Sequence, residues 1–390
     1  MRTSLIAPEA RASISFALAL AGIFACSSSP PASPADAGTA TDGGTQVGDA
    51  GAEGGDAACA AEGATIQQGL DTERARQKLQ HAVIGLETPR CGKRVFLSHD
   101  PAAKVSVTEA SLWRIGSITK TFVSAVILDL AASGKLGLDD TLDKFVPTFP
   151  NAAGITVRQL MNHTSGIFNY TTGKEFSDAL AADPKRKYTG AELLAFATPH
   201  PPSFEPGKSW EYSNTNYVLL GLIAEKVGGA PIASLVRAGA LQKAGLTHTF
   251  FAGAEPVTGE MTPGFLGKQD VTNLYDPSVA WAAGAIASTP GDLLDWVHAL
   301  YASERVLNAA SQAELRTLVP KAGYGLGVQQ IPATNTLGNG AGWGHGGSIA
   351  GFQSQAFWFE GSNVGLVTIV DDTKGDPNAL SIVALQSLSE

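Results

Sequence analysis

Apolar residues recur at helical spacing from Phe122 to Leu130, which predicts a helix over residues 117–132. Gly134 follows in the position of a C-terminal helix cap. Helix-favouring composition and spacing predict further helices at residues 67–80, 157–162, 191–197, 217–227, 232–240, 290–303 and 378–388. Most of these predicted helices lie in the middle of the chain.

Strand-like runs lie near both ends of the globular part of the chain and are scarce in its middle. They comprise residues 82–86, 93–98, 325–330, 349–359 and 364–370. We therefore predict an α+β fold: an antiparallel sheet built from both chain ends and covered by helices. A mostly helical lobe, about residues 136–285, is inserted between the two groups of strands.

The first residues are typical of an export signal. A basic start precedes an apolar stretch at residues 14–25, which is too short to cross a bilayer as a helix. The residues directly before Cys26 resemble a bacterial lipoprotein cleavage box. We predict a signal peptide over residues 1–25 and lipidation of Cys26, which would give an exported cell-envelope lipoprotein held at the membrane. An ordinary signal peptide cut after Ala37 is the alternative, and it predicts a secreted protein.

Residues 26–60 are mostly small or polar, and they carry five acidic residues and no Lys or Arg, hence −5 of the net charge of −9. Such a segment buries too little apolar surface to fold, so we predict a disordered acidic linker. Residues 61–390 have the composition of a globular domain. Their acidity, and the lack of a Lys/Arg cluster, argue against a nucleic-acid partner. The sequence does not indicate an oligomeric state.

Two cysteines, Cys59 and Cys91, remain beyond Cys26. In an exported protein they could form one disulfide, stabilising the fold by roughly 3–4 kcal/mol. Two free thiols are the alternative. The chain has no closely spaced His/Cys/carboxylate set, which argues against a metal site.

Ser117 and Lys120 begin the predicted helix at residues 117–132. Residues three apart lie on one helix face, so the amine can reach the hydroxyl. A serine is a weak nucleophile until a neighbouring base takes its proton, and a lysine can do so when burial lowers its pKa. The helix start also offers free backbone N–H groups to a developing negative charge. A solvated helix lysine is the alternative interpretation of Lys120.

Two further clusters could complete a site. Tyr212 and Asn214 lie on a loop that enters a helix, where each could also be a simple cap or turn residue. His345, Gly347 and Ser348 lie among glycines before a predicted strand, and such glycines permit close approach of a ligand to the backbone. Ser165 follows a histidine by two residues, but adjacency in sequence is not the geometry of a catalytic triad.

Taken together, the three clusters resemble the motifs of the serine β-lactamase and penicillin-binding protein superfamily. The resemblance is to its class C β-lactamase-like branch, with D-alanyl-D-alanine carboxypeptidases, D-aminopeptidases and related esterases. That branch carries Ser-x-x-Lys, Tyr-x-Asn and Lys/His-x-Gly, matched here at residues 117–120, 212–214 and 345–347. The resemblance covers nearly all of residues 61–390, including residues 158–166 and 324–327.

The resemblance implies a role for each matched residue. Ser117 would attack a carbonyl and form an acyl-enzyme, and Lys120 would take its proton, directly or through Tyr212. Tyr212 would pass a proton to the leaving group, and Asn214 would orient Lys120 and the substrate. The backbone N–H groups of Ser117 and Ser348 would form the oxyanion hole. The family's reaction needs no cofactor.

The third motif bears on the substrate. Many β-lactamases have Lys-Thr-Gly there, whereas His345 is expected to be largely neutral and Gly346 has no hydroxyl. Both changes weaken recognition of a carboxylate. We therefore predict a serine hydrolase of D-amino-acid peptides, amides or esters, similar to a D-alanyl-D-alanine carboxypeptidase. A class C-like β-lactamase, a short-chain esterase and a catalytically silent envelope sensor are the alternatives.

Overall fold

A computed structural model describes residues 51–388, with side chains from residue 56 onward. The predicted signal peptide, the lipidation site Cys26 and the linker up to residue 50 lie outside the described residues. Expectations for these segments stay predictions.

Six strands form one antiparallel sheet in the order β2-β1-β11-β10-β9-β8. They are β1 (His81–Thr88), β2 (Gly92–His99), β8 (Gln329–Ile331), β9 (Gly342–Ile349), β10 (Phe352–Phe359) and β11 (Val364–Val370). The N-terminal and C-terminal strands meet inside the sheet, where Ala82 pairs with Val370. This confirms the predicted antiparallel sheet built from both chain ends.

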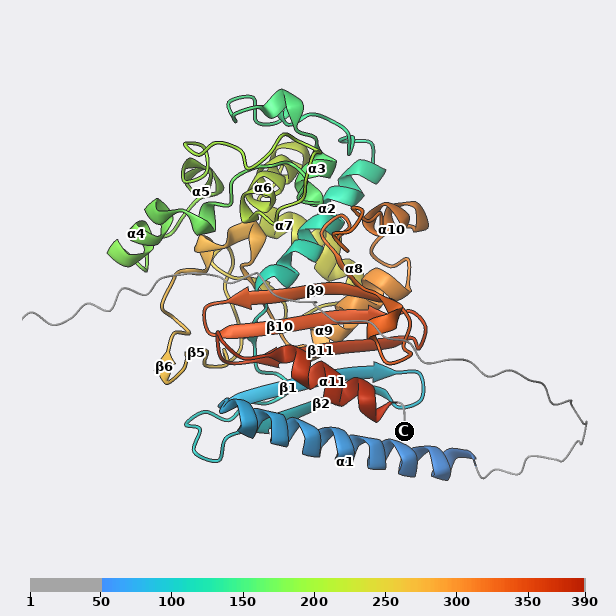
Figure 1. Cartoon of the computed structure of the whole chain (residues 1–390). Coiled ribbons are helices and arrows are strands. Elements are labelled where there is room, and N and C mark those ends of the chain that lie inside the picture. The colour runs from blue at the N-terminus through green and yellow to red at the C-terminus, as the bar shows by residue number, and fades with distance from the viewer. Residues whose placement is uncertain (1–50, 389–390) are drawn as a thin grey trace, which may run out of the picture.

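Helices cover both faces of the sheet because its strands are apolar on both sides. Side chains alternate along β1, so Ala82 faces the helices α1 (Gly51–Gln77) and α11 (Pro377–Ser387), and Val83 faces the larger core. Figure 1 shows α1 and α11 lying against the sheet at the end of the molecule opposite the inserted helical lobe.

The larger core joins the sheet to the inserted helical lobe. Its central helices are α2 (Thr119–Ala132) and α9 (Pro290–Val297), held together by Phe122 and Trp296, whose rings stack with centroids 3.9 Å apart. The lobe contains α3 (Val157–Met161), α4 (Lys174–Ala182), α5 (Gly190–Ala195), α6 (Asn214–Gly228), α7 (Ile232–Val236) and α8 (Gln242–Ala244).

The remaining elements are short. Strands β3 (Trp113–Arg114), β7 (Ile286–Ser288) and β4 (Phe250–Phe251) form a second sheet. Strands β5 (Phe265–Leu266) and β6 (Gln269–Asp270) form a two-stranded hairpin, and α10 (Ala309–Leu315) precedes β8. Within residues 51–388 no single helix has the length and apolarity of a membrane span, although the bent pair Asn214–Gly228 and Ile232–Ala244 passes by length and composition.

Helix α1 begins at Gly51, so the predicted linker does not extend to residue 60. Local composition does not predict the N-terminal part of this helix, because the residues that it contacts are distant in sequence. Cys59 forms a disulfide with Cys91, and the buried Glu62 carboxylate pairs with both Arg90 and Arg94. These contacts hold α1 against the β1–β2 hairpin at its third and fourth turns.

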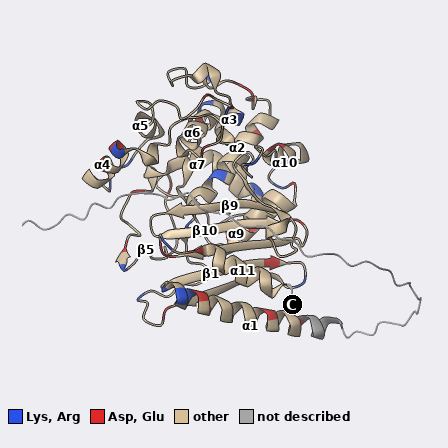
Figure 2. Cartoon of the chain, in the orientation of Figure 1, with Lys and Arg blue, Asp and Glu red and all other residues tan. Residues whose placement is uncertain are grey.

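The strand positions near the C-terminus also differ from those predicted. The strand expected at residues 325–330 is reduced to β8 (Gln329–Ile331). Residues 345–348, expected to precede a strand at residues 349–359, lie within β9. Glycine has a low strand propensity, which hides β9 in the sequence. Figure 2 shows positions of Lys and Arg scattered among those of Asp and Glu along the described chain. The absence of a nucleic-acid partner stays a prediction.

Candidate active site

Ser117 lies in a single 3₁₀ turn, Gly116–Ile118, that leads directly into α2. This turn places Ser117 and Lys120 one above the other. The Lys120 Nζ lies 2.9 Å from the Ser117 Oγ, 2.9 Å from the Asn214 Oδ1 and 2.7 Å from the Ala283 carbonyl oxygen. Two of these three groups are acceptors only, so a neutral amine can donate to both and turn its lone pair to the serine hydroxyl.

Lys120 is fully buried, and among the described residues no carboxylate forms an ion pair with it. Burial therefore lowers the pKa of its amine well below the ordinary lysine value. The nearest electron-rich groups are aromatic: the Nζ lies 4.9 Å from the Tyr212 ring centroid and 5.4 Å from that of Tyr217. This environment favours an amine that can accept the proton of Ser117.

Asn214 is the first residue of α6, and Tyr212 lies in the loop two residues before it. Asn214 accepts from Lys120 through its Oδ1 and donates through its Nδ2 to the Thr171 Oγ1 at 3.2 Å, which fixes the amide. The Tyr212 hydroxyl is buried without a hydrogen-bond partner in the described structure, but it faces Ser117 closely enough for that hydroxyl to act on its pKa. Burial, the larger effect, raises the pKa of the Tyr212 phenol far above its usual range, so the phenol keeps its proton.

The third predicted cluster lies on β9, whose backbone packs against the turn that carries Ser117. A Cβ atom on Gly347 would lie 1.9 Å from the Ile115 carbonyl oxygen, and one on Gly116 would lie 2.8 Å from the Ser348 backbone nitrogen. Gly116 also has φ of +50°, which favours glycine. The missing side chains let the backbone at residues 115–116 lie directly against the backbone at residues 347–348. An oxyanion hole formed by the N–H groups of Ser117 and Ser348 requires such a close approach.

His345 lies on β9 beside these groups and is buried. Burial, and to a lesser degree the charge of Lys120, lower the pKa of its imidazole to about 3. The ring is therefore neutral at pH 7, as the sequence predicts. Its two nitrogens contact the Tyr324 hydroxyl and the Gly346 carbonyl oxygen.

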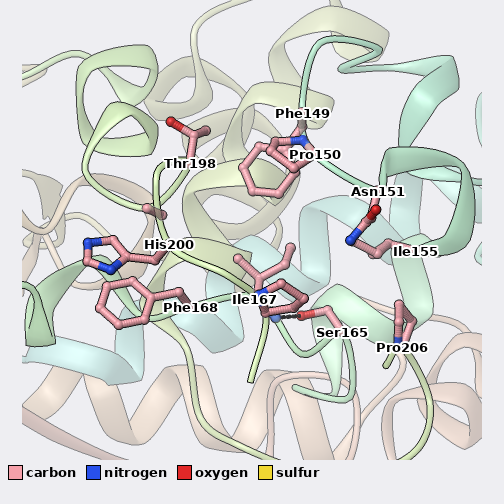
Figure 3. Close-up of a pocket in the computed structure, with 12 residues that line it drawn as sticks. Phe149, Pro150, Asn151, Ile155, Ser165, Ile167, Phe168, Thr198, His200 and Pro206 are labelled. Atoms are coloured by element: carbon pink, nitrogen blue, oxygen red, sulfur yellow. Dashed lines mark hydrogen bonds between the residues drawn. The ribbon is translucent and has the colours of Figure 1, made fainter. Parts of the chain in front are cut away.

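Ser165 lies outside this cluster. Its Oγ donates a hydrogen bond to the Asn216 Oδ1 at 2.7 Å. An amide oxygen is not a base that could take the hydroxyl proton. Figure 3 shows Ser165 at the edge of a small cavity in the helical lobe, lined by residues such as Phe149, Ile167 and His200. The lining contains none of the predicted site residues, and we assign the cavity no role.

Sequence reasoning overlooked three groups at the site. The Ala283 carbonyl accepts from Lys120, and the side chains of His163 and Tyr324 lie behind Tyr212 and His345. A carbonyl leaves no signal in a sequence. His163 and Tyr324 lie in segments that resemble the family, but spacing alone gives them no role. No cluster of potential metal ligands occurs within residues 51–388.

The fold and this constellation define a class, that of the active-serine hydrolases. Residues 66–386 match the family described as Beta-lactamase, and the chain belongs to that family.

Relatives and solved structures agree with this assignment. Penicillin-binding protein 4* of Bacillus subtilis (strain 168) is 35% identical over 145 residues, which are 36% of this chain and 30% of that protein. A D-stereospecific amidohydrolase from Streptomyces sp. superposes with a TM-score of 0.72 at 30% identity, covering 82% of this chain and 98% of that one. D-amino acid amidase from Ochrobactrum anthropi SV3, complexed with L-phenylalanine amide, gives a TM-score of 0.75 at 25% identity, covering 85% and 100%.

The curated relatives are longer than the matched region. The matches span 30%, 54% and 38% of the first three of them. The two superposed structures, in contrast, are covered almost completely.

Proposed function

We propose that the protein hydrolyses amide bonds of D-amino-acid derivatives through an acyl-enzyme on Ser117. One observation carries the proposal: a fully buried lysine, which pairs with no carboxylate within residues 51–388, lies 2.9 Å from the hydroxyl of a serine at a helix start. The amidohydrolase and amidase among the solved neighbours support the choice of amide substrates.

Acylation begins when the Ser117 Oγ attacks the substrate carbonyl carbon and its proton passes to Lys120. We assign the base to Lys120 because burial lowers the pKa of its amine and raises the pKa of the Tyr212 phenol. The carbonyl oxygen becomes an oxyanion held by the N–H groups of Ser117 and Ser348, each contributing roughly 3–4 kcal/mol to transition-state stabilisation.

The oxyanion intermediate collapses when the carbon–nitrogen bond breaks. The proton held by Lys120 passes through the Tyr212 hydroxyl to the leaving amine, which departs neutral. A water molecule then attacks the ester carbonyl while Lys120 takes one of its protons. Cleavage of the bond to Ser117 releases a carboxylic acid, and the serine regains its proton. The reaction requires no cofactor.

The third motif bears on which substrates fit. A neutral His345 gives the site no cation for a carboxylate next to the scissile bond. This favours D-amino-acid amides, esters and neutral-ended peptides over free-carboxylate D-Ala-D-Ala peptides, although the resemblance led us to expect a carboxypeptidase-like substrate. It also disfavours penicillin- and cephalosporin-type β-lactams, which carry that carboxylate. Turnover of a chromogenic β-lactam at an enzyme-like rate would reverse the ranking.

A fluorescent fluorophosphonate tests the nucleophile. Wild-type protein should be labelled on Ser117, as identified by peptide mass spectrometry, and Ser117→Ala should remain unlabelled. Ser165→Ala is the matched control, because it removes the other serine that the sequence brings forward. Folded wild-type protein that resists labelling would instead support the silent sensor alternative.

A substrate panel tests the specificity. It compares D- and L-amino-acid amides, p-nitrophenyl esters, D-Ala-D-Ala peptides and a β-lactam, on wild type and Ser117→Ala. The proposal expects the highest kcat/KM for a D-amino-acid amide. A preference for L-amides, or for the free-carboxylate peptides, contradicts it.

A further inference from the structure

A line of buried hydrogen bonds joins the second motif to the third. The Ser213 N–H donates to the His163 Nδ1 at 3.2 Å, and the His163 Nε2 lies 3.2 Å from the Tyr324 hydroxyl. That hydroxyl lies 2.9 Å from the His345 Nε2, and the His345 Nδ1 contacts the Gly346 carbonyl oxygen. The three side chains of His163, Tyr324 and His345 are buried, so water does not compete for these bonds.

The two ends of this line fix its direction independently. At one end a backbone N–H can only donate, so the His163 Nδ1 is an acceptor and its Nε2 carries the proton given to Tyr324. At the other end a carbonyl can only accept, so the His345 Nδ1 carries a proton and its Nε2 accepts from Tyr324. Both arguments require the Tyr324 hydroxyl, which Tyr217 also approaches, to accept from His163 and to donate to His345.

The same residues pack against the phenol at the active site. The His163 ring lies against the Tyr212 ring, with centroids 4.3 Å apart, and touches Tyr324 edge-on at 4.9 Å. His163 has φ of +62°, an uncommon conformation for a residue with a side chain, and its Nδ1 also receives a hydrogen bond from Asn216. The backbone conformation aims the ring into the gap between the two motifs.

We propose that His163 and Tyr324 are positioning residues whose one-way hydrogen-bond chain holds Tyr212 over Ser117 and occupies both ring nitrogens of His345. The substrate then meets the backbone of β9 at the third motif and not the His345 side chain. This inference rests on the proposed function for its kinetic consequence, but the hydrogen-bond chain itself exists in the protein without substrate.

Histidine tautomers give a direct test that needs no activity. Long-range proton–nitrogen NMR of protein labelled with ¹⁵N-histidine, at pH 7, should show His163 protonated on Nε2 only and His345 on Nδ1 only. His163→Asn and His345→Gln each remove one of the signals from the seven histidines and so assign them. An imidazolium at either position, or the opposite tautomer, overturns the proposal whatever the enzyme hydrolyses.

Kinetics test the positioning role. Tyr324→Phe removes the central hydroxyl and should lower kcat about 10- to 100-fold with KM for a neutral amide nearly unchanged, as expected for a lost buried hydrogen bond that aligns the site. Tyr301→Phe is the matched control, because the Tyr301 hydroxyl is buried without a hydrogen-bond partner in the described structure. The control should keep wild-type kcat.

A double-mutant cycle separates positioning from general destabilisation. His163→Asn suits the positive φ and keeps a short acceptor for Ser213, but cannot reach Tyr324. If the hydrogen bonds from His163 through Tyr324 to His345 act as one unit, the double variant His163→Asn/Tyr324→Phe loses no more kcat than the more impaired of the two single variants. Additive losses, or a wild-type kcat in Tyr324→Phe, contradict the proposal. If no substrate is turned over at all, the tautomer result still decides it.

Discussion

At the residue scale, the site depends on a fully buried amine that forms no ion pair with a carboxylate among the described residues. Lys120 is held by Ser117, Asn214 and the Ala283 carbonyl, and none of these carries a negative charge. A profile of kcat/KM against pH should reveal the lowered pKa of this amine. Because the pKa of Lys120 lies well below the usual lysine value, kcat/KM should rise as pH rises through that lowered pKa, where the amine loses its proton and becomes a base.

Two variants identify the group that titrates. Lys120→Arg keeps a permanent cation and should lose about 100- to 10,000-fold in kcat, the usual contribution of a general base. Tyr212→Phe should lose activity but keep the same acidic limb. If that limb disappears in Tyr212→Phe, the phenol and not Lys120 is the base.

A second prediction at this scale concerns two neighbouring glycines. Gly347→Ala would place a methyl group 1.9 Å from the Ile115 carbonyl oxygen and 2.4 Å from the Ser354 Oγ, so β9 would have to move away from Ser117. We expect a loss in kcat of about 100- to 1,000-fold, as for one lost oxyanion donor.

Gly346→Ala is the control for Gly347→Ala, because its methyl group would meet only ordinary contacts, the nearest at 3.6 Å from the Gln329 Oε1. It should retain most activity. Crystal structures or amide exchange of the two variants would show whether β9 has moved. Equal kcat values for the two variants would contradict the assigned role of the close backbone approach.

The sequence suffices to propose Ser117, Lys120 and Asn214 as a group, because two of the three share a helix turn and the third belongs to a motif. The structure brings these three within hydrogen-bonding distance. The roles of His163 and Tyr324 follow only from contacts between segments remote in sequence, which no local pattern contains. A backbone partner such as the Ala283 carbonyl is likewise invisible to residue-type reasoning.

At the element scale, helix α1 depends on its tie to the β1–β2 hairpin. The Cys59–Cys91 disulfide closes a loop with a sequence separation of 32, and the Glu62 pairs with Arg90 and Arg94 lie beside it. Cys59→Ser should therefore lower the free energy of unfolding by roughly 3–4 kcal/mol, as loop-closure entropy predicts. Denaturant unfolding of wild type and variant measures this directly.

The active site should not respond to the Cys59→Ser change, because α1 packs on the face of the sheet opposite α2. The variant should keep wild-type kcat at temperatures where it stays folded. Wild-type protein treated with a reductant is the matching condition. An unchanged unfolding midpoint in both would show that the disulfide does not constrain the unfolded chain.

Elements with strong local signals were predictable and those sustained by tertiary contacts were not. The apolar spacing of α2 is sufficient on its own to predict a helix, and the β-branched residues of β11 are sufficient to predict a strand. Strand β9 escaped prediction because its glycines, which the close backbone contacts require, suppress strand propensity. The first turns of α1 escaped because Ala, Gly and Asp there resemble a linker until the disulfide and the Glu62 pairs are known.

At the scale of the whole molecule, we propose that the domain is exported and held at the membrane by a lipid on Cys26. The proposal rests on the sequence, since Cys26 lies outside the described residues. Expressed in a bacterial host, the full chain should incorporate labelled palmitate and fractionate with membranes, whereas Cys26→Ser should remain unlabelled. A wild-type chain without label, cut after Ala37, would support the secreted alternative.

The central pairing of β1 with β11 has a consequence for the order in which the protein can be made. The buried His81–Asp371 contact, at 2.7 Å, joins residues 290 positions apart in sequence. During synthesis, which begins at the N-terminus, the sheet can therefore be completed only after the last strands have been made. The nucleophile is synthesised early, while β9, which carries its oxyanion partner, comes near the end. A nascent chain therefore contains Ser117 but no complete active site until almost its whole length is free to fold. Hydrolysis cannot begin before the C-terminal strands have been synthesised and have joined the sheet.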